Sequence, residues 1–176
     1  MAPARVVLTG GECTGKTSLA RALAARYRAA FSEEAAREVA GAKPGPLGAE
    51  DVPAIARTHV RLADDAILRA AGADVVFFDQ DLLSTVVYAK HYYGSCPLWI
   101  ERVAAERRAD LYLLCAPDLP WESDGIRDRP TARGEMHALF EAALREAGVR
   151  TAEVSGAGYA RELAAARAVD ELLAGR

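Results

Sequence analysis

Residues 10–17 read Gly-Gly-Glu-Cys-Thr-Gly-Lys-Thr and fit the pattern G-x-x-x-x-G-K-[ST] of a phosphate-binding loop, or P-loop. Such a loop turns successive backbone N–H groups toward an anion, which demands unusual backbone angles at Gly10 and Gly15. Lys16 can bridge the β- and γ-phosphates of ATP, and the Thr17 hydroxyl can ligate Mg²⁺. The alternative is an ordinary glycine turn between a strand and a helix. We expect binding of ATP and Mg²⁺ through Gly10, Gly11, Glu12, Cys13, Thr14, Gly15, Lys16, Thr17 and Ser18.

Two carboxylates, Asp79 and Asp81, follow the apolar run at residues 75–78. A carboxylate at the end of a parallel strand faces the P-loop across the sheet. Asp79 is therefore expected to hold Mg²⁺ together with Thr17, or to accept the proton of the acceptor hydroxyl. Asp81 is expected to contact substrate hydroxyls. The alternative role for each carboxylate is to cap the N-terminus of the next helix.

Charged and aromatic side chains in two further segments are candidates for contact with an acceptor molecule. Glu34 and Arg37 lie in a run of charges at residues 33–38, which is otherwise typical of a solvated helix face. Tyr88 and Tyr92 are four residues apart in a predicted helix and could stack on a flat heterocycle. Packing in the core is the equally good alternative for the two tyrosines.

The segment at residues 117–133 combines prolines, a glycine and several arginines, and predicts a loop that closes over the triphosphate. Closure would expel water and bring positive charge to the transferring phosphoryl group. We expect Arg127 and Arg129 to have this catalytic role. Arg133 is expected to contact ATP, and Trp121 and Asp124 are expected to contact the acceptor. The alternative is an exposed loop without function.

The elements that must position these residues alternate between strand and helix. Such alternation implies right-handed crossovers and an α/β, three-layer fold with a parallel sheet of about five strands. The Gly- and Pro-rich residues 41–48 are expected to form a flexible connection without chemistry. Apolar runs predict strands at 5–9, 28–32, 73–79, 109–115 and 149–154, and helical spacing predicts helices at 16–30, 49–71, 84–92, 98–108, 131–147 and 159–174.

Length and composition limit the class of protein. The 176 residues fit a single domain, which we expect to span 1–176. The 22 Lys and Arg against 25 Asp and Glu give a net charge of -3, so no overall field favours nucleic acid or an anionic membrane. No apolar run approaches the roughly 20 residues that cross a bilayer. The three scattered cysteines favour a reducing, cytoplasmic environment, and the three histidines show no metal spacing. The partner expected from a P-loop kinase is a small molecule. Whether the protein forms a homo-oligomer stays open.

Several P-loop classes are excluded by the sequence. It contains no Asn and therefore lacks the N-K-x-D segment with which Ras-type GTPases select guanine. Motor and transporter ATPases are usually longer and carry further motifs. A compact chain with an arginine-rich segment late in the sequence favours a kinase of small molecules.

Four motifs recur together over nearly the whole chain: residues 10–17, Glu34-Ala-Ala-Arg37-Glu38, Phe78-Asp79-Gln80-Asp81, and residues 120–127, Pro-Trp-Glu-Ser-Asp-Gly-Ile-Arg. In order and spacing they resemble the ribosylnicotinamide kinase domain of NadR-type NAD-biosynthesis proteins. The resemblance implies a P-loop kinase fold and ATP-dependent phosphorylation of nicotinamide riboside to nicotinamide mononucleotide.

The resemblance also bears on activities that are not expected. NadR proteins can carry an adenylyltransferase domain and a DNA-binding segment before the kinase, whereas this sequence starts at the kinase strand, so neither activity is expected here. Two alternatives to the nicotinamide riboside kinase stay open. One is a kinase for another nucleoside or small metabolite, and the other is a regulatory module that binds ATP and hydrolyses it slowly.

Overall fold

A five-stranded parallel sheet forms the centre of the computed structural model, which describes residues 2–120 and 133–176. Within these residues the strand order is β2-β3-β1-β4-β5, and every neighbouring pair is parallel. The predicted sheet is therefore confirmed. The strands are β1 (Ala4–Thr9), β2 (Phe31–Ser32), β3 (Val75–Asp79), β4 (Leu111–Cys115) and β5 (Thr151–Val154).

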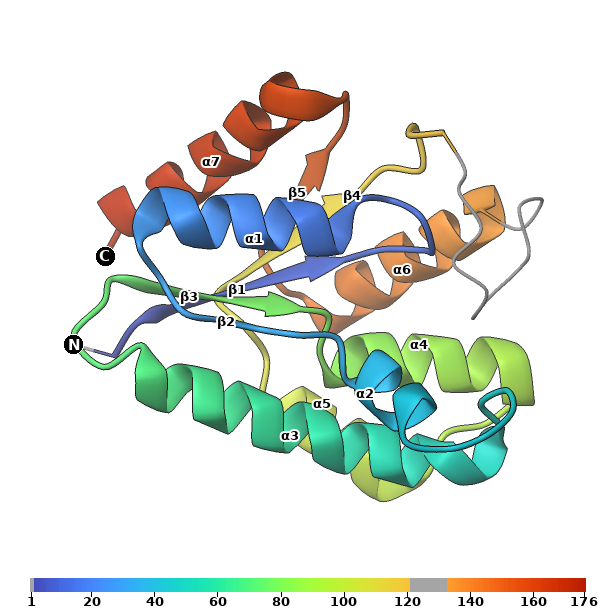
Figure 1. The fold of residues 1–176 in the computed structure, drawn as a ribbon. Coiled ribbons are helices and arrows are strands. Elements are labelled where there is room, and N and C mark those ends of the chain that lie inside the picture. Colours follow the sequence, from blue (N-terminus) through green and yellow to red (C-terminus); the bar gives the residue numbers. More distant parts are fainter. Residues whose placement is uncertain (1, 121–132) are drawn as a thin grey trace.

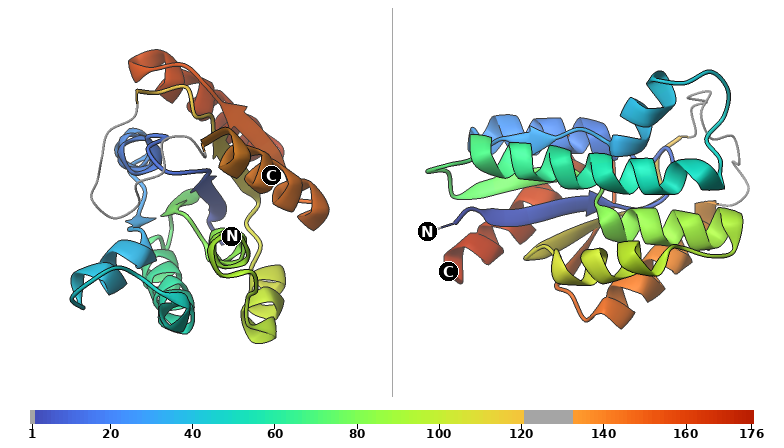
Figure 2. Two further views of the ribbon diagram at one scale, coloured as in Figure 1. Left: turned by 90° about the vertical axis from the view of Figure 1, so that its right-hand side faces the viewer. Right: turned by 90° about the horizontal axis from the view of Figure 1, so that it is seen from below.

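Helices cover both faces of the sheet, which gives the predicted three layers (Figure 1, Figure 2). On one face lie α1 (Lys16–Tyr27) and α7 (Gly158–Ala174). The other face carries α3 (Val52–Arg69), α4 (Leu82–Tyr93) and α6 (Arg133–Ala147). Two further helices pack outside this layer, α2 (Ala35–Gly41) against α3 and α5 (Leu98–Glu106) against α4. No helix in residues 2–120 or 133–176 is long and apolar enough to span a membrane.

The two-residue period of the strands divides the core between these faces. In β1, Val6 and Leu8 pack with Leu23 of α1, while Val7 between them packs with Phe140 of α6. All five of these side chains are at most 2% exposed. Burial on both faces explains why the strands are nearly continuous apolar runs.

Several predicted boundaries are wrong by a few residues, and local backbone geometry gives the reasons. The first helix ends at Tyr27 rather than at residue 30, because Arg28 adopts a left-handed conformation with φ 49°. The predicted helix at 49–71 is a short 3-10 turn, Ala49–Asp51, followed by α3, whose start is marked by Pro53. Helix α2 is an element that the sequence did not predict.

The carboxyl ends of the strands meet at one edge of the sheet, at the right of Figure 1, whereas both chain termini lie at the opposite end. The P-loop follows β1 at this edge, and Asp79 ends β3. The register pairs Leu8 of β1 with Asp79, so the two features are adjacent. The fold thus brings the P-loop and Asp79 together, as expected from the sequence.

Candidate active site

The P-loop has the backbone conformation that its two framing glycines make accessible. Gly10 has φ +130°, and a Cβ atom there would lie 2.9 Å from the carbonyl oxygen of Cys115. Gly15 has φ +74° and directly precedes α1, where a Cβ atom would lie 2.8 Å from the Leu119 side chain. Gly10 is therefore required for conformation and for space, because the nearby atom belongs to the backbone, whereas Gly15 is favoured by its conformation, since the Leu119 side chain can move. The alternative of an ordinary glycine turn does not account for the double constraint at Gly10.

Lys16 lies inside the loop rather than in solvent. Its side chain is 8% exposed, and its Nζ donates a hydrogen bond to the Gly11 carbonyl over 2.5 Å. The same Nζ lies 3.4 Å from the hydroxyl of Thr14, which itself donates to the Gly11 carbonyl. A buried ammonium group and the N-terminal end of α1 thus meet at one point. This combination is suited to bind an anion.

Asp79 is the buried carboxylate of the site, with no exposed surface. Its Oδ2 accepts a hydrogen bond from the Thr17 hydroxyl over 2.5 Å, while its Oδ1 has no hydrogen-bond partner among the described residues. Burial raises the pKa of Asp79 to about 6, although the Thr17 hydrogen bond and the nearby Lys16 charge act in the opposite direction. The carboxylate is therefore poised to exchange a proton or to bind a cation near neutral pH.

Thr17 and Asp79 are also the residues that could hold a divalent cation. Within the described residues, no group of three or more His, Cys, Asp or Glu side chains could do so. Mg²⁺ does not need such a group, because it is bound through few protein oxygens and completes its coordination with water and phosphate oxygens. The hydroxyl of Thr17, the Oδ1 atom of Asp79 and a bound triphosphate fit this pattern.

A cavity of about 360 Å³ opens beside the P-loop, large enough for a small organic ligand. It lies between α2, α3 and α4. One wall is aromatic, another carries a carboxylate, and the rest is mostly apolar. The lining residues are Glu34, Ala36, Pro46, Leu47, Val52, Ile55, His59, Gln80, Ser84, Thr85, Tyr88, Ala89, Tyr92 and Tyr93.

Tyr88 and Tyr92 form the aromatic wall and join the cavity to the P-loop. Their rings are nearly parallel, at 3°, with centroids 6.0 Å apart. The hydroxyl of Tyr88 donates to the Gly10 carbonyl over 3.3 Å, and that of Tyr92 donates to Glu12 over 2.7 Å. Tyr88 also packs edge-on against Phe140, so this tyrosine serves both the core and the cavity wall.

Glu34 supplies the acidic wall of the cavity. It is 7% exposed, and its carboxylate accepts hydrogen bonds from Arg37 over 3.0 Å and from Gln80 over 3.4 Å. The structure thus brings Glu34 and Arg37 together, although Arg37 itself does not line the cavity. Sequence reasoning missed Gln80, which lies between the two candidate aspartates and has a left-handed backbone with φ 71°.

Asp81 does not line this cavity but a smaller one that also includes Gln80, and its predicted contact with substrate stays a prediction. Its Oδ1 accepts a hydrogen bond from the backbone N–H of Ser84, as the N-cap of α4, and its Oδ2 accepts one from the Tyr112 hydroxyl over 2.7 Å. Burial raises its pKa. Because both oxygens are used by the fold itself, the geometry favours the alternative helix-cap role.

The segment at residues 41–48, in which the sequence shows no chemistry, contributes Pro46 and Leu47 to the lining of the cavity. His59, one of the three histidines without metal spacing, is 7% exposed and also lines this cavity. Neither contribution has a signal in the sequence. Both arise from the way α2 and α3 fold over α4.

The arginine-rich segment is described only at its ends. Trp121, Asp124, Arg127 and Arg129 lie outside the described residues. Arg133 is described, and it donates hydrogen bonds to the carbonyls of Cys13 and Leu119 over 3.2 and 2.8 Å. Its guanidinium therefore contacts the backbone of the P-loop, near the predicted ATP site.

The sequence of this chain matches a known protein family. The family model described as an AAA domain matches residues 5–161. The chain belongs to this AAA domain family. Two curated relatives, the trifunctional NAD biosynthesis/regulator proteins NadR of Salmonella typhimurium and Escherichia coli, are 28% identical to this chain over 160 residues. The match covers 88% of this chain and 38% of each relative, so the chain spans well under half of their length.

Solved structures agree with the sequence matches. The chain is similar to a NadR protein in complex with NR, with a TM-score of 0.81 and 26% identity, covering 98% of this chain and 51% of that one. It is similar to NadR in complex with NAD and AMP-PNP, with a TM-score of 0.84 and 27% identity, covering 98% and 50%. Thymidylate kinase from Ehrlichia chaffeensis, with a TM-score of 0.61, 12% identity and coverage of 98% and 100%, shares the fold. The resemblance to NadR-type proteins is therefore confirmed.

Proposed function

We propose that this AAA domain is a kinase that transfers the γ-phosphoryl group of ATP to the 5′-hydroxyl of nicotinamide riboside, giving nicotinamide mononucleotide. The observation that carries the proposal is the junction of a P-loop, a buried carboxylate and an aromatic, acidic cavity. Tyr88 and Tyr92 connect the cavity to the P-loop by hydrogen bonds. A phosphate donor and a flat acceptor can thus bind side by side.

The P-loop side of the site supports ATP as the donor. Loop N–H groups and the Lys16 ammonium would neutralise the β- and γ-phosphates, where negative charge concentrates during transfer. The similarity to a NadR structure that contains AMP-PNP, an analogue of ATP, supports the same assignment. Lys16 would have to exchange its present contact with the Gly11 carbonyl for phosphate oxygens.

Thr17 and Asp79 would hold Mg²⁺, which screens the phosphate charges when it is bound. Asp79 can serve the reaction in one of two ways, as a partner of this ion or as the base that takes the proton of the acceptor hydroxyl. Its position between the P-loop and Gln80, a residue of the cavity wall, suits both. Either role needs the ionised carboxylate, and its pKa of about 6 leaves it largely ionised at pH 7.5.

The cavity supports nicotinamide riboside as the acceptor. The nicotinamide ring of this nucleoside carries a positive charge, which favours aromatic faces and carboxylates. Tyr88 and Tyr92 provide the aromatic faces, and Glu34 provides a buried carboxylate. A similar protein has been crystallised with NR, the usual abbreviation of nicotinamide riboside. Common nucleosides with neutral bases would gain less from this wall.

The arginine-rich segment remains part of the proposal as a prediction. Arg127 and Arg129 would bring positive charge to the transferring group, and Trp121 and Asp124 would contact the acceptor. For Arg133, the contacts with Cys13 and Leu119 support a place at the nucleotide side of the site.

A thermal-shift screen tests the acceptor assignment directly. With Mg²⁺ and AMP-PNP present, nicotinamide riboside at 100 times its dissociation constant should stabilise the protein by about 2.7 kcal/mol. Uridine, cytidine, thymidine and adenosine at the same concentration should give clearly smaller shifts. Tyr92→Leu should reduce the shift by nicotinamide riboside, whereas Tyr159→Leu, at an exposed tyrosine of α7, should not. An equal shift by a common nucleoside would contradict the assignment of the acceptor.

A further inference from the structure

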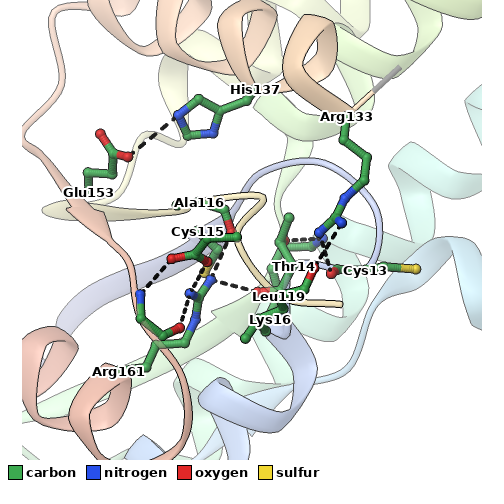
Figure 3. A network of polar contacts seen from close by, with 12 residues as sticks. Cys13, Thr14, Lys16, Cys115, Ala116, Leu119, Arg133, His137, Glu153 and Arg161 are labelled. Carbon is green, nitrogen blue, oxygen red and sulfur yellow. Dashed lines mark hydrogen bonds and ion pairs between the residues drawn. The ribbon is translucent and has the colours of Figure 1, made fainter. Parts of the chain in front are cut away.

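A buried arginine outside the P-loop holds the backbone of that loop. Arg161 lies in the first turn of α7, is 4% exposed, and directs its guanidinium behind the loop (Figure 3). Its Nη2 donates hydrogen bonds to the carbonyl oxygens of Thr14 over 2.9 Å and Ala116 over 3.1 Å. Its Nη1 donates to Asp118 over 2.7 Å and to the carbonyl of Gly156 over 2.8 Å. One side chain thus ties the P-loop to the segments after β4 and β5.

The backbone carbonyl groups of a phosphate-binding loop need hydrogen-bond donors such as Arg161. When its N–H groups turn toward the anion, the carbonyl groups of the same peptides turn away from it, into the protein. A buried carbonyl without a donor costs stability, so these oxygens need partners. In this chain two arginines provide them from different sides, Arg161 for Thr14 and Arg133 for Cys13 (Figure 3).

We infer that Arg161 is a positioning residue of the nucleotide site: by holding the Thr14 carbonyl, it keeps the N–H groups of the P-loop directed at the phosphates. The inference rests on the proposed use of the P-loop for ATP and is independent of the acceptor. Burial prevents Arg161 from reaching the phosphates around the loop, so its contribution passes through the backbone of Thr14.

Asp118 fixes the orientation of this arginine. One carboxylate oxygen accepts from Arg161, and the other accepts from the backbone N–H of Gly156 over 2.6 Å. The guanidinium is planar and can serve both sets of acceptors at once, whereas the ammonium of lysine is a point donor that can reach only one set. The inferred role therefore requires arginine rather than any cation.

The test measures the dissociation constant of Mg·AMP-PNP by calorimetry, with no acceptor present and below the melting temperature of each variant. Arg161→Ala should weaken binding at least about tenfold, which corresponds to about 1.4 kcal/mol. The dissociation constant of Arg161→Lys should lie between those of Arg161→Ala and the wild type. Asp118→Asn should weaken binding less than Arg161→Ala does. Arg167→Gln changes an exposed arginine of the same helix and should bind as the wild type does.

Chemical rescue separates positioning from general loss of packing. Guanidinium chloride at low millimolar concentration should restore much of the affinity of Arg161→Ala, while sodium chloride at the same ionic strength should not. An affinity of Arg161→Ala within twofold of the wild type would overturn the inference, and so would a loss that guanidinium does not restore. If Arg161→Ala does not fold, an unchanged affinity of Arg161→Lys would overturn it. Because no acceptor is used, failure of the proposed kinase activity would leave this result intact and distinguishable.

Discussion

The Thr17 hydroxyl donates a hydrogen bond to the Oδ2 atom of Asp79 over 2.5 Å and so joins the first turn of α1 to the end of β3. The carboxylate is fully buried, and its Oδ1 has no partner among the described residues. Burial of an incompletely paired carboxylate costs stability, and such a cost is typical of a residue kept for its function. This relationship leads to two predictions about Asp79.

The first prediction concerns the stability of the ligand-free protein. The pKa of Asp79 rises from its ordinary value of 3.8 to about 6 on folding. The folded state therefore binds more protons between these values, and the contribution of Asp79 to stability falls as the pH rises through this window. Asp79→Asn removes the effect and should stabilise the protein by about 3 kcal/mol at pH 8 but hardly at pH 4.

Denaturant unfolding at the two pH values, with a chelator present, checks this result. Asp74→Asn, at an exposed aspartate just before β3, is the matched control and should leave stability nearly unchanged at both. If Asp79→Asn raises the free energy of unfolding equally at pH 4 and pH 8, ionisation of Asp79 does not cause the stabilisation.

The second prediction concerns turnover. Asp79→Asn keeps the size of the side chain and removes its charge, so kcat should fall by roughly 10²-fold or more if Asp79 acts as base or as partner of Mg²⁺. For the wild type, kcat/KM, which reports the free enzyme, should decline as the pH falls below about 6, because the carboxyl group of Asp79 becomes protonated. Steady-state kinetics measure both. An unchanged kcat with a raised KM would instead assign Asp79 a role in positioning substrate.

Lys16→Ala should give a folded protein that retains less than about a tenth of the wild-type turnover, because the ammonium is needed where negative charge develops. Lys90→Ala is the control, since Lys90 is a lysine on α4 that pairs with Glu101 outside the site. Initial rates of ADP formation and melting curves measure the two properties. Turnover above a tenth of the wild type would remove Lys16 from the mechanism.

Asp81 should prove to be structural. Asp81→Ala removes the N-cap of α4 and leaves the Tyr112 hydroxyl without its acceptor, so it should destabilise the protein by about 2–4 kcal/mol. Asp81→Asn should keep most of the cap and leave the KM of the acceptor within about threefold of the wild type, because asparagine caps helices well. A rise of tenfold or more in the KM of Asp81→Asn would return Asp81 to the substrate site.

The features that could be predicted from the sequence are those in which local chemistry decides. The P-loop follows from glycines whose positive φ values and close contacts are built into residues 10–17. The position of Asp79 follows from the end of a buried strand. Asp81 could not be assigned in this way, because a strand-end carboxylate and a helix cap have the same sequence. Its role depends on the hydroxyl of Tyr112, which belongs to another strand.

Long-range contacts explain the other differences. Arg161 lies 147 residues after Thr14, and only the packing of α7 beside α1 brings its guanidinium to the loop. Pro46 and Leu47 become cavity residues because their segment returns toward α4. Such contacts leave no periodic or motif-like pattern in a single sequence, so tertiary structure is needed to find them.

The most direct test of the proposed kinase is ADP release with each nucleoside under identical conditions with ATP and Mg²⁺. We predict that nicotinamide riboside is phosphorylated with a kcat/KM at least about tenfold above that of uridine, cytidine, thymidine and adenosine, a difference of about 1.4 kcal/mol in transition-state binding. A common nucleoside that equals nicotinamide riboside would contradict the substrate while leaving the kinase intact. ADP release that is the same with and without any acceptor would contradict the kinase itself and point to a regulatory ATPase.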